Sequence, residues 1–90
     1  PAVIFDLLEL KILYLSCNKI QEIPKEIEKL SNLEELDLGY NQIKKLSINF
    51  NNLKKLKILP MHNNMIEKIP KEIKNLSNLE ELNFTFNNIK

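Results

Sequence analysis

The chain has 90 residues and a mass of 10.6 kDa, which corresponds to one small domain or part of one. Its composition, 43% hydrophobic and 28% charged, is that of a folded chain and excludes general disorder. The net charge of +1 balances 13 basic against 12 acidic residues, so bulk electrostatic attraction to nucleic acid or to a membrane is excluded.

Other protein classes are excluded by single features. Cys17 is the only cysteine, so no internal disulfide can form. No apolar run approaches the ~20 residues of a membrane-spanning helix. Residues 1–10 lack the basic region and cleavage site of a signal peptide, and the cellular compartment stays unpredicted. Because the chain does not begin with Met, we expect a fragment of a longer protein.

The first predicted element is a strand at residues 10–15, where the apolar positions of LKILYL alternate. A short helical or 3₁₀ segment follows, because Pro24, Ile27 and Leu30 lie at helix-like intervals and proline suits a first helical turn. The same strand pattern returns three times along the chain, at 33–38, 56–61 and 79–84.

These elements repeat every 23 residues. The step is visible in the leucine column Leu10, Leu33, Leu56 and Leu79, and in the asparagine column Asn18, Asn41, Asn64 and Asn87. A single unit cannot bury its own apolar face, so stacked units must share a continuous core and a parallel sheet.

The unit LxxLxLxxNxIxxIPxxIxxLxx resembles the leucine-rich repeat, in the 23-residue form common in bacterial proteins, over the whole chain. The resemblance implies an α/β fold: a right-handed horseshoe solenoid with a parallel sheet on its concave face and short helical or 3₁₀ segments on its convex face. It also implies that the column asparagines form a ladder of hydrogen bonds with the turn backbone. We expect one domain over residues 1–90, without capping segments, divided into units 1–9 (partial), 10–32, 33–55, 56–78 and 79–90 (partial).

The second full unit departs from the others. Ser47 takes the place of Pro24, and Phe50 takes the place of Ile27. The strand sequences alternate as well, with LKILYL and LKILPM against LEELDL and LEELNF, so we infer that a block of two units was duplicated.

The resemblance implies partner binding on the concave strand face, where side chains between the buried leucines point outward. The candidate partner-binding residues are Ile12, Tyr14, Glu35, Asp37, Ile58, His62, Glu81 and Asn83. Tyr14 and Ile58 are either interface anchors or ordinary exposed apolar residues, and both interpretations stay open. Tyr40 and Phe86 are expected to pack beside the turn. The lysines at 44, 45, 54, 55 and 57 are interpreted as a solvated face.

The sequence predicts no enzyme, cofactor or metal site. Cys17 and His62 should lie two strands apart, about 10 Å, which is too far for a hydrogen-bonded catalytic pair. Glu35, Asp37 and Glu81 offer only oxygen ligands and are spread over three strands, so no calcium site is expected. Gly39 is the only glycine, so no phosphate-binding loop is expected.

The solenoid ends and residue 60 carry two further predictions. Core positions should be exposed at both ends of the stack, favouring end-to-end association, a domain swap or a longer parent protein. These positions are Ile4, Leu7, Leu10 and Leu13 at one end, and Leu82, Phe84 and Ile89 at the other. Pro60 lies within the third strand and has no N–H, so one ladder hydrogen bond should be missing there.

Three functional hypotheses follow. The leading one is a protein-binding module that uses the concave face and has an unidentified protein partner. The second is a structural or self-assembling segment that associates through its ends. The third is the recognition domain of a larger enzyme or effector.

Overall fold

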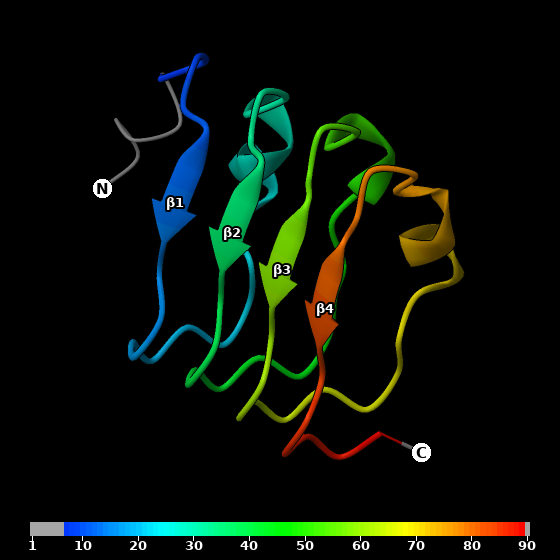
Figure 1. Cartoon of the computed structure of the whole chain (residues 1–90). Helices are drawn as coiled ribbons and strands as arrows, with labels where there is room; N and C mark the ends of the chain where they lie inside the picture. The colour runs from blue at the N-terminus through cyan, green and yellow to red at the C-terminus, as the bar shows by residue number, and fades with distance from the viewer. Residues whose placement is uncertain (1–6, 90) are drawn as a thin grey trace.

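The computed structural model describes residues 7–89 as a stack of parallel strands with return segments behind them (Figure 1). The strands are β1 (Ile12–Tyr14), β2 (Glu35–Asp37), β3 (Ile58–Pro60) and β4 (Glu81–Asn83), in the spatial order β1-β2-β3-β4. The return segments contain the 3₁₀ helices η2 (Lys25–Lys29), η3 (Phe50–Asn52) and η4 (Lys71–Asn75). The predicted solenoid with a parallel sheet is confirmed, and its helical segments are 3₁₀ turns. The prediction for Ile4 lies outside the described residues.

The strand register follows the 23-residue step. Leu13 pairs with Leu36, and Leu59 pairs with Leu82. An isolated parallel bridge between Glu22 and Lys45 keeps the same step on the return side. Each backbone position therefore meets its own equivalent in the next unit, which is why one sequence pattern can build the whole stack.

Pro60 interrupts the ladder between β2 and β3. Three register pairs join β1 to β2 and three join β3 to β4, but only Glu35 and Ile58 are paired between β2 and β3. Pro60 cannot donate a backbone hydrogen bond, but its carbonyl accepts one from the N–H of Leu38 at 2.9 Å. The strand therefore includes Pro60 at the cost of one ladder bond.

The core lies between the sheet and the return segments. Side chains from both sides are fully buried, including Leu36 and Leu59 from the strands and Ile27 and Phe50 from the 3₁₀ turns. This arrangement follows from the two periodicities of the sequence, which place one apolar row inward on the strands and another inward on the turns.

The 3₁₀ turns begin in two different ways. Pro24 and Pro70 precede η2 and η4 with φ of −60° and −63°, values that the proline ring favours. In the second full unit (residues 33–55), which has no proline at this place, Asn49 precedes the shorter η3. The side-chain oxygen of Asn49 accepts a hydrogen bond from the N–H of Asn51 at 3.0 Å. The side-chain cap therefore replaces the proline as the start signal of the turn.

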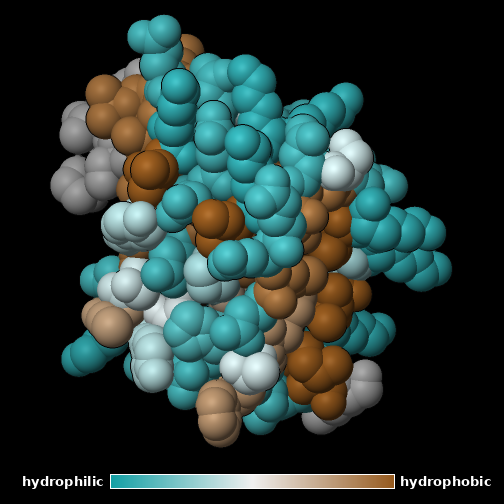
Figure 2. Space-filling view, in the orientation of Figure 1, coloured by the Kyte–Doolittle hydropathy of each residue, from teal (hydrophilic) through white to brown (hydrophobic). Residues whose placement is uncertain are grey.

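The two ends of the described stack expose apolar side chains, with one correction to the prediction. Leu7, Leu82 and Ile89 are exposed, and Figure 2 shows a hydrophobic band along the side of the molecule beyond β4. The prediction is wrong for Leu13, which is buried in the shared core, with Leu10 and Leu15 packed against that core. Leu10 and Phe84 are partly buried against the core.

Candidate functional site

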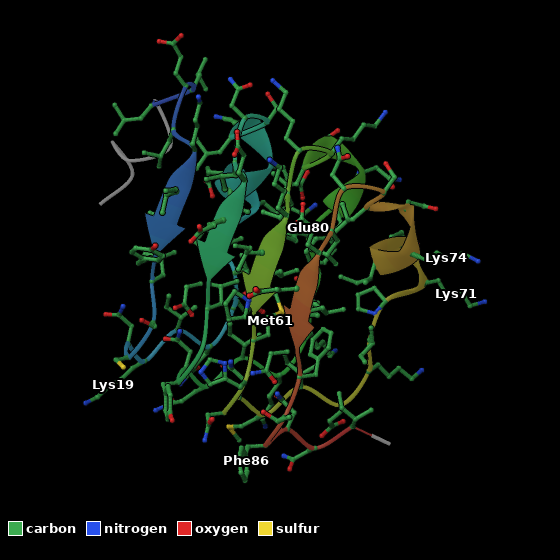
Figure 3. The ribbon with its side chains drawn as sticks, in the orientation of Figure 1. Lys19, Met61, Lys71, Lys74, Glu80 and Phe86 are labelled. Atoms are coloured by element: carbon green, nitrogen blue, oxygen red, sulfur yellow. The ribbon has the colours of Figure 1, made fainter. Side chains whose placement is uncertain are left out.

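The candidate site is the strand face, which we define as the outward positions of each strand, the residue before each strand and the residue two places after it. Its members are Lys11, Ile12, Tyr14, Ser16, Glu34, Glu35, Asp37, Gly39, Lys57, Ile58, Pro60, His62, Glu80, Glu81, Asn83 and Thr85. Figure 2 shows this face as mostly hydrophilic with isolated hydrophobic side chains. Lys71 and Lys74 on η4 point away from it (Figure 3).

The β1 edge presents the most exposed apolar groups of this face. Ile12 is 48% and Tyr14 is 63% exposed. The Tyr14 hydroxyl donates a hydrogen bond to the Glu35 carboxylate at 3.0 Å, and this bond raises the pKa of Tyr14. The negative charge of Glu35 adds to the rise, because it disfavours the phenolate. Tyr14 is therefore exposed, and its hydroxyl is hydrogen-bonded to the neighbouring strand.

The middle strands present flatter, half-buried groups. Glu35, Asp37 and Ile58 are each partly covered by their neighbours. An oxygen of Asp37 accepts a hydrogen bond from the N–H of Gly39 at 3.0 Å, so the turn backbone holds this carboxylate in place. At the equivalent position of β4, Asn83 accepts from both the N–H and the hydroxyl of Thr85, at 3.0 and 2.8 Å.

His62 lies lower on the strand face than the sequence predicted. It is half-buried, and its ring covers Gly39, where an added Cβ would come within 2.8 Å of ring atoms. The Tyr40 ring meets it edge-on, with centroids 5.2 Å apart and an interplanar angle of 88°. The Nδ1 atom of His62 is buried and has no hydrogen-bond partner among the described residues. The sequence predicted an exposed His62. Because Gly39 has no side chain, the imidazole instead packs against the Gly39 backbone and is half-buried.

Charged residues gather at the start of the strands. Lys57 and Glu34 form an ion pair with an N–O distance of 3.8 Å, with both side chains more than a third exposed. An exposed pair of this kind contributes little to stability. Glu80 stands near the start of β4 (Figure 3). The sequence analysis grouped Lys57 with the solvated lysines, whereas the structure places it directly before β3, beside Glu34.

The column asparagines lie below the strand face and bridge consecutive units. Asn64 is buried, and its amide nitrogen donates to the carbonyls of Leu38 and Met61 at 2.9 and 3.1 Å, and to that of His62 at 3.3 Å. Its oxygen accepts from the N–H of Ile43 at 3.1 Å. Asn41 and Asn87 make the equivalent contacts, whereas the exposed Asn18 donates only within its own turn. The ladder therefore ties each turn to the unit before it.

The residue before each column asparagine has an unusual backbone. Cys17, Tyr40, Asn63 and Phe86 have φ values of 59°, 53°, 57° and 56°. Non-glycine residues adopt this left-handed conformation at a cost, and no glycine in the column revealed it in the sequence. The prediction that Phe86 packs beside the turn is wrong: it is 78% exposed and projects from the turn (Figure 3). Tyr40 finds a ring neighbour in the next unit, and no described unit follows Phe86.

A hollow on the return side is a weaker candidate site. It measures about 370 Å³ and is lined by Lys44, Lys45, Leu46, Ser47, Glu67, Lys68 and Pro70. It lies at the second full unit (residues 33–55), where the small Ser47 replaces a proline. The lysines on its rim are exposed, and ligand sites are usually lined by apolar side chains with a few fixed polar groups, so we rank the hollow below the strand face.

No group of three or more His, Cys, Asp or Glu side chains within residues 7–89 comes together as a metal site. In the same range, no helix has the length and hydropathy needed to cross a membrane.

Comparison with known proteins defines the class. A family model described as a leucine-rich repeat region matches residues 2–88, so the chain belongs to the leucine-rich repeat family. A search of curated proteins returned no significant match.

Two solved structures share the architecture. A leucine-rich repeat protein of Leptospira interrogans is 40% identical, with a TM-score of 0.90 over 100% of this chain and 23% of its own. An internalin of Listeria monocytogenes is 26% identical, with a TM-score of 0.74 over 97% of this chain and 31% of its own. The chain thus spans less than a third of either protein.

Proposed function

We propose that the chain is a protein-interaction module that binds its partner on the strand face. The observation that carries this proposal is the exposure of Tyr14, an aromatic group held in place by its hydrogen bond to Glu35. A rigid exposed aromatic side chain loses little conformational entropy on binding and is a common interface anchor. Ile12 and Ile58 extend the apolar contact across the sheet. Membership of the leucine-rich repeat family and the similarity to an internalin support the proposal.

The test is a comparison of paired surface variants. Tyr14→Ala with Ile58→Ala removes the apolar anchors of the strand face. Lys25→Ala with Lys71→Ala is the matched control, because it removes two exposed side chains from the return side. We expect the first pair to abolish capture of a partner and the control pair to leave it unchanged. Full partner binding by the Tyr14→Ala, Ile58→Ala variant would refute the proposal.

A second candidate function is self-association through the ends of the stack. Leu82 and Ile89 are 40% and 43% exposed beside the unpaired edge of β4, and such an edge can pair with another chain. Solution mass measured over a range of concentrations tests this candidate. A mass that rises with concentration and returns to that of the monomer in Leu82→Glu supports it, whereas a constant monomer mass refutes it.

A third candidate is the recognition domain of a larger enzyme or effector. The candidate is supported by the fact that the chain spans only 23% and 31% of the two similar structures. Sequencing the complete gene tests this candidate, because a neighbouring catalytic domain would support it.

A further inference from the structure

The strand face has an acidic character that the whole molecule does not share. It holds five carboxylates, on Glu34, Glu35, Asp37, Glu80 and Glu81, against the two ammonium groups of Lys11 and Lys57. The whole chain has a net charge of +1, so lysine must be in excess elsewhere. Figure 3 shows two of these lysines, Lys71 and Lys74, pointing away from the strand face. The negative potential is therefore local to the strand face.

The acidic groups alternate with apolar ones from strand to strand. The outward row across the sheet reads Ile12, Glu35, Ile58 and Glu81, and register pairs join each residue to the next. Neighbouring strands lie about 4.8 Å apart, so like residues recur about every 10 Å. The face thus presents apolar groups at that spacing with a carboxylate between them.

The carboxylates of this row are differently engaged. One oxygen of Glu35 accepts the Tyr14 hydroxyl, and Glu81 is exposed on β4. One oxygen of the nearby Asp37 accepts a hydrogen bond from the backbone N–H of Gly39. Among the described residues, these carboxylates do not form a group of metal ligands, so the strand face offers no binding site for a single small cation. A larger partner that brings several cationic groups fits the pattern better.

We propose that the partner of the strand face is a cationic protein segment, in which lysine or arginine side chains alternate with apolar ones. This inference rests on the proposed function and specifies its partner chemistry. The apolar side chains contact Ile12, Tyr14 and Ile58, and the cations meet the carboxylates of β2 and β4. Charge complementarity of this kind steers association and selects against anionic partners.

A designed helical peptide serves as the probe. Seven residues of α-helix advance about 10.5 Å, close to the two-strand repeat of the face. The probe has leucine at every seventh position and lysine four residues after each leucine. The first control peptide replaces every lysine with glutamate, and the second contains the same residues in shuffled order.

The measurement is the dissociation constant of each peptide with the full chain. We expect the cationic peptide alone to bind, with an affinity that falls as salt rises from about 50 to about 300 mM, since exposed charges are screened. We expect Glu35→Lys with Glu81→Lys to weaken it at least about tenfold, because like charges then face each other. Circular dichroism confirms that each variant is folded.

Three outcomes would overturn the inference. They are no binding of the cationic peptide at millimolar concentration, equal binding of the glutamate peptide, and binding unaffected by salt and charge reversal. The proposed function fails separately. If Tyr14→Ala with Ile58→Ala loses a partner that Glu35→Lys with Glu81→Lys retains, strand-face binding stands and the cationic assignment is lost.

Discussion

At the scale of single residues, residue 39 is a glycine because there is no room for a side chain, and not because its backbone angle requires one. Its φ is not positive, so an alanine could adopt the same conformation. The His62 ring covers it so closely that a Cβ would meet ring atoms at 2.8 Å. The half-buried imidazole and the missing side chain therefore depend on each other, and a substitution at one position should change the effect of a substitution at the other.

The effect of Gly39→Ala on the free energy of unfolding is therefore expected to change sign when His62 is also substituted. In the native chain it should destabilise the fold by about 1 kcal/mol, because the imidazole must move. In a His62→Ala background it should stabilise by about 0.5 kcal/mol, because alanine restricts the unfolded chain without a clash. Urea denaturation of the four variants measures the coupling. Equal effects of Gly39→Ala in both backgrounds would show that the ring does not constrain this position.

Tyr14 should titrate above its ordinary range, because its pKa is raised by the hydrogen bond to Glu35 and by the charge of that carboxylate. The fold thus favours the protonated phenol, and this contribution to stability is lost as pH rises through the raised pKa. Glu35→Gln should lower the pKa of Tyr14 toward 10.0, its ordinary value. An ultraviolet titration in a Tyr40→Phe background detects Tyr14 alone, since the chain has two tyrosines. Glu81→Gln is the control. A Tyr14 pKa that is the same with and without Glu35→Gln would contradict the prediction.

At the scale of elements, the asparagine ladder stabilises the turns in proportion to its burial. Asn64 satisfies the N–H of Ile43 and three carbonyls in two units, all through one buried amide. A buried polar group left without a partner costs about 1–3 kcal/mol. Asn18 is exposed, and the groups it serves can turn to water.

Asn64→Ala should therefore cost about 3 kcal/mol and Asn18→Ala less than about 1 kcal/mol. The first loss is a large part of the total stability of a domain of this size, which is about 5–13 kcal/mol. Urea denaturation of both variants gives the two values. Similar losses at the two positions would mean that the ladder acts within each turn and does not join neighbouring units.

The elements also show how far the sequence could predict the structure. The 23-residue step predicted which positions meet in neighbouring strands, because each unit repeats the same contacts with its neighbours. The spacing of Pro24, Ile27 and Leu30 predicted a helical or 3₁₀ segment, and the structure shows 3₁₀ turns. It could not predict the depth of His62, which depends on a glycine just beyond the end of β2. Nor could it predict the positive φ of Tyr40 and Phe86, because that column contains no glycine and holds four different residue types.

At the scale of the whole molecule, stability should vary along the stack. Each unit contacts only its neighbours, so a central unit is covered on both sides and a terminal one on one side. The inward leucine column shows the gradient: Leu36 and Leu59 are fully buried, and Leu82 is 40% exposed. The same substitution made along this column therefore measures how much each neighbour contributes.

Leu36→Ala should cost about 3 kcal/mol, within the range for buried leucines, because a cavity remains between β1 and β3. Leu82→Ala should cost about 1 kcal/mol, because water already reaches that side chain and its apolar contact is smaller. Thermal or urea denaturation at low protein concentration gives both values. If copies associate through this end, the cost of Leu82→Ala must grow with protein concentration, because association buries the leucine and stabilises the folded chain by mass action. A cost that is the same at all concentrations would show that Leu82 stays exposed to solvent, and end-to-end association through it would be excluded.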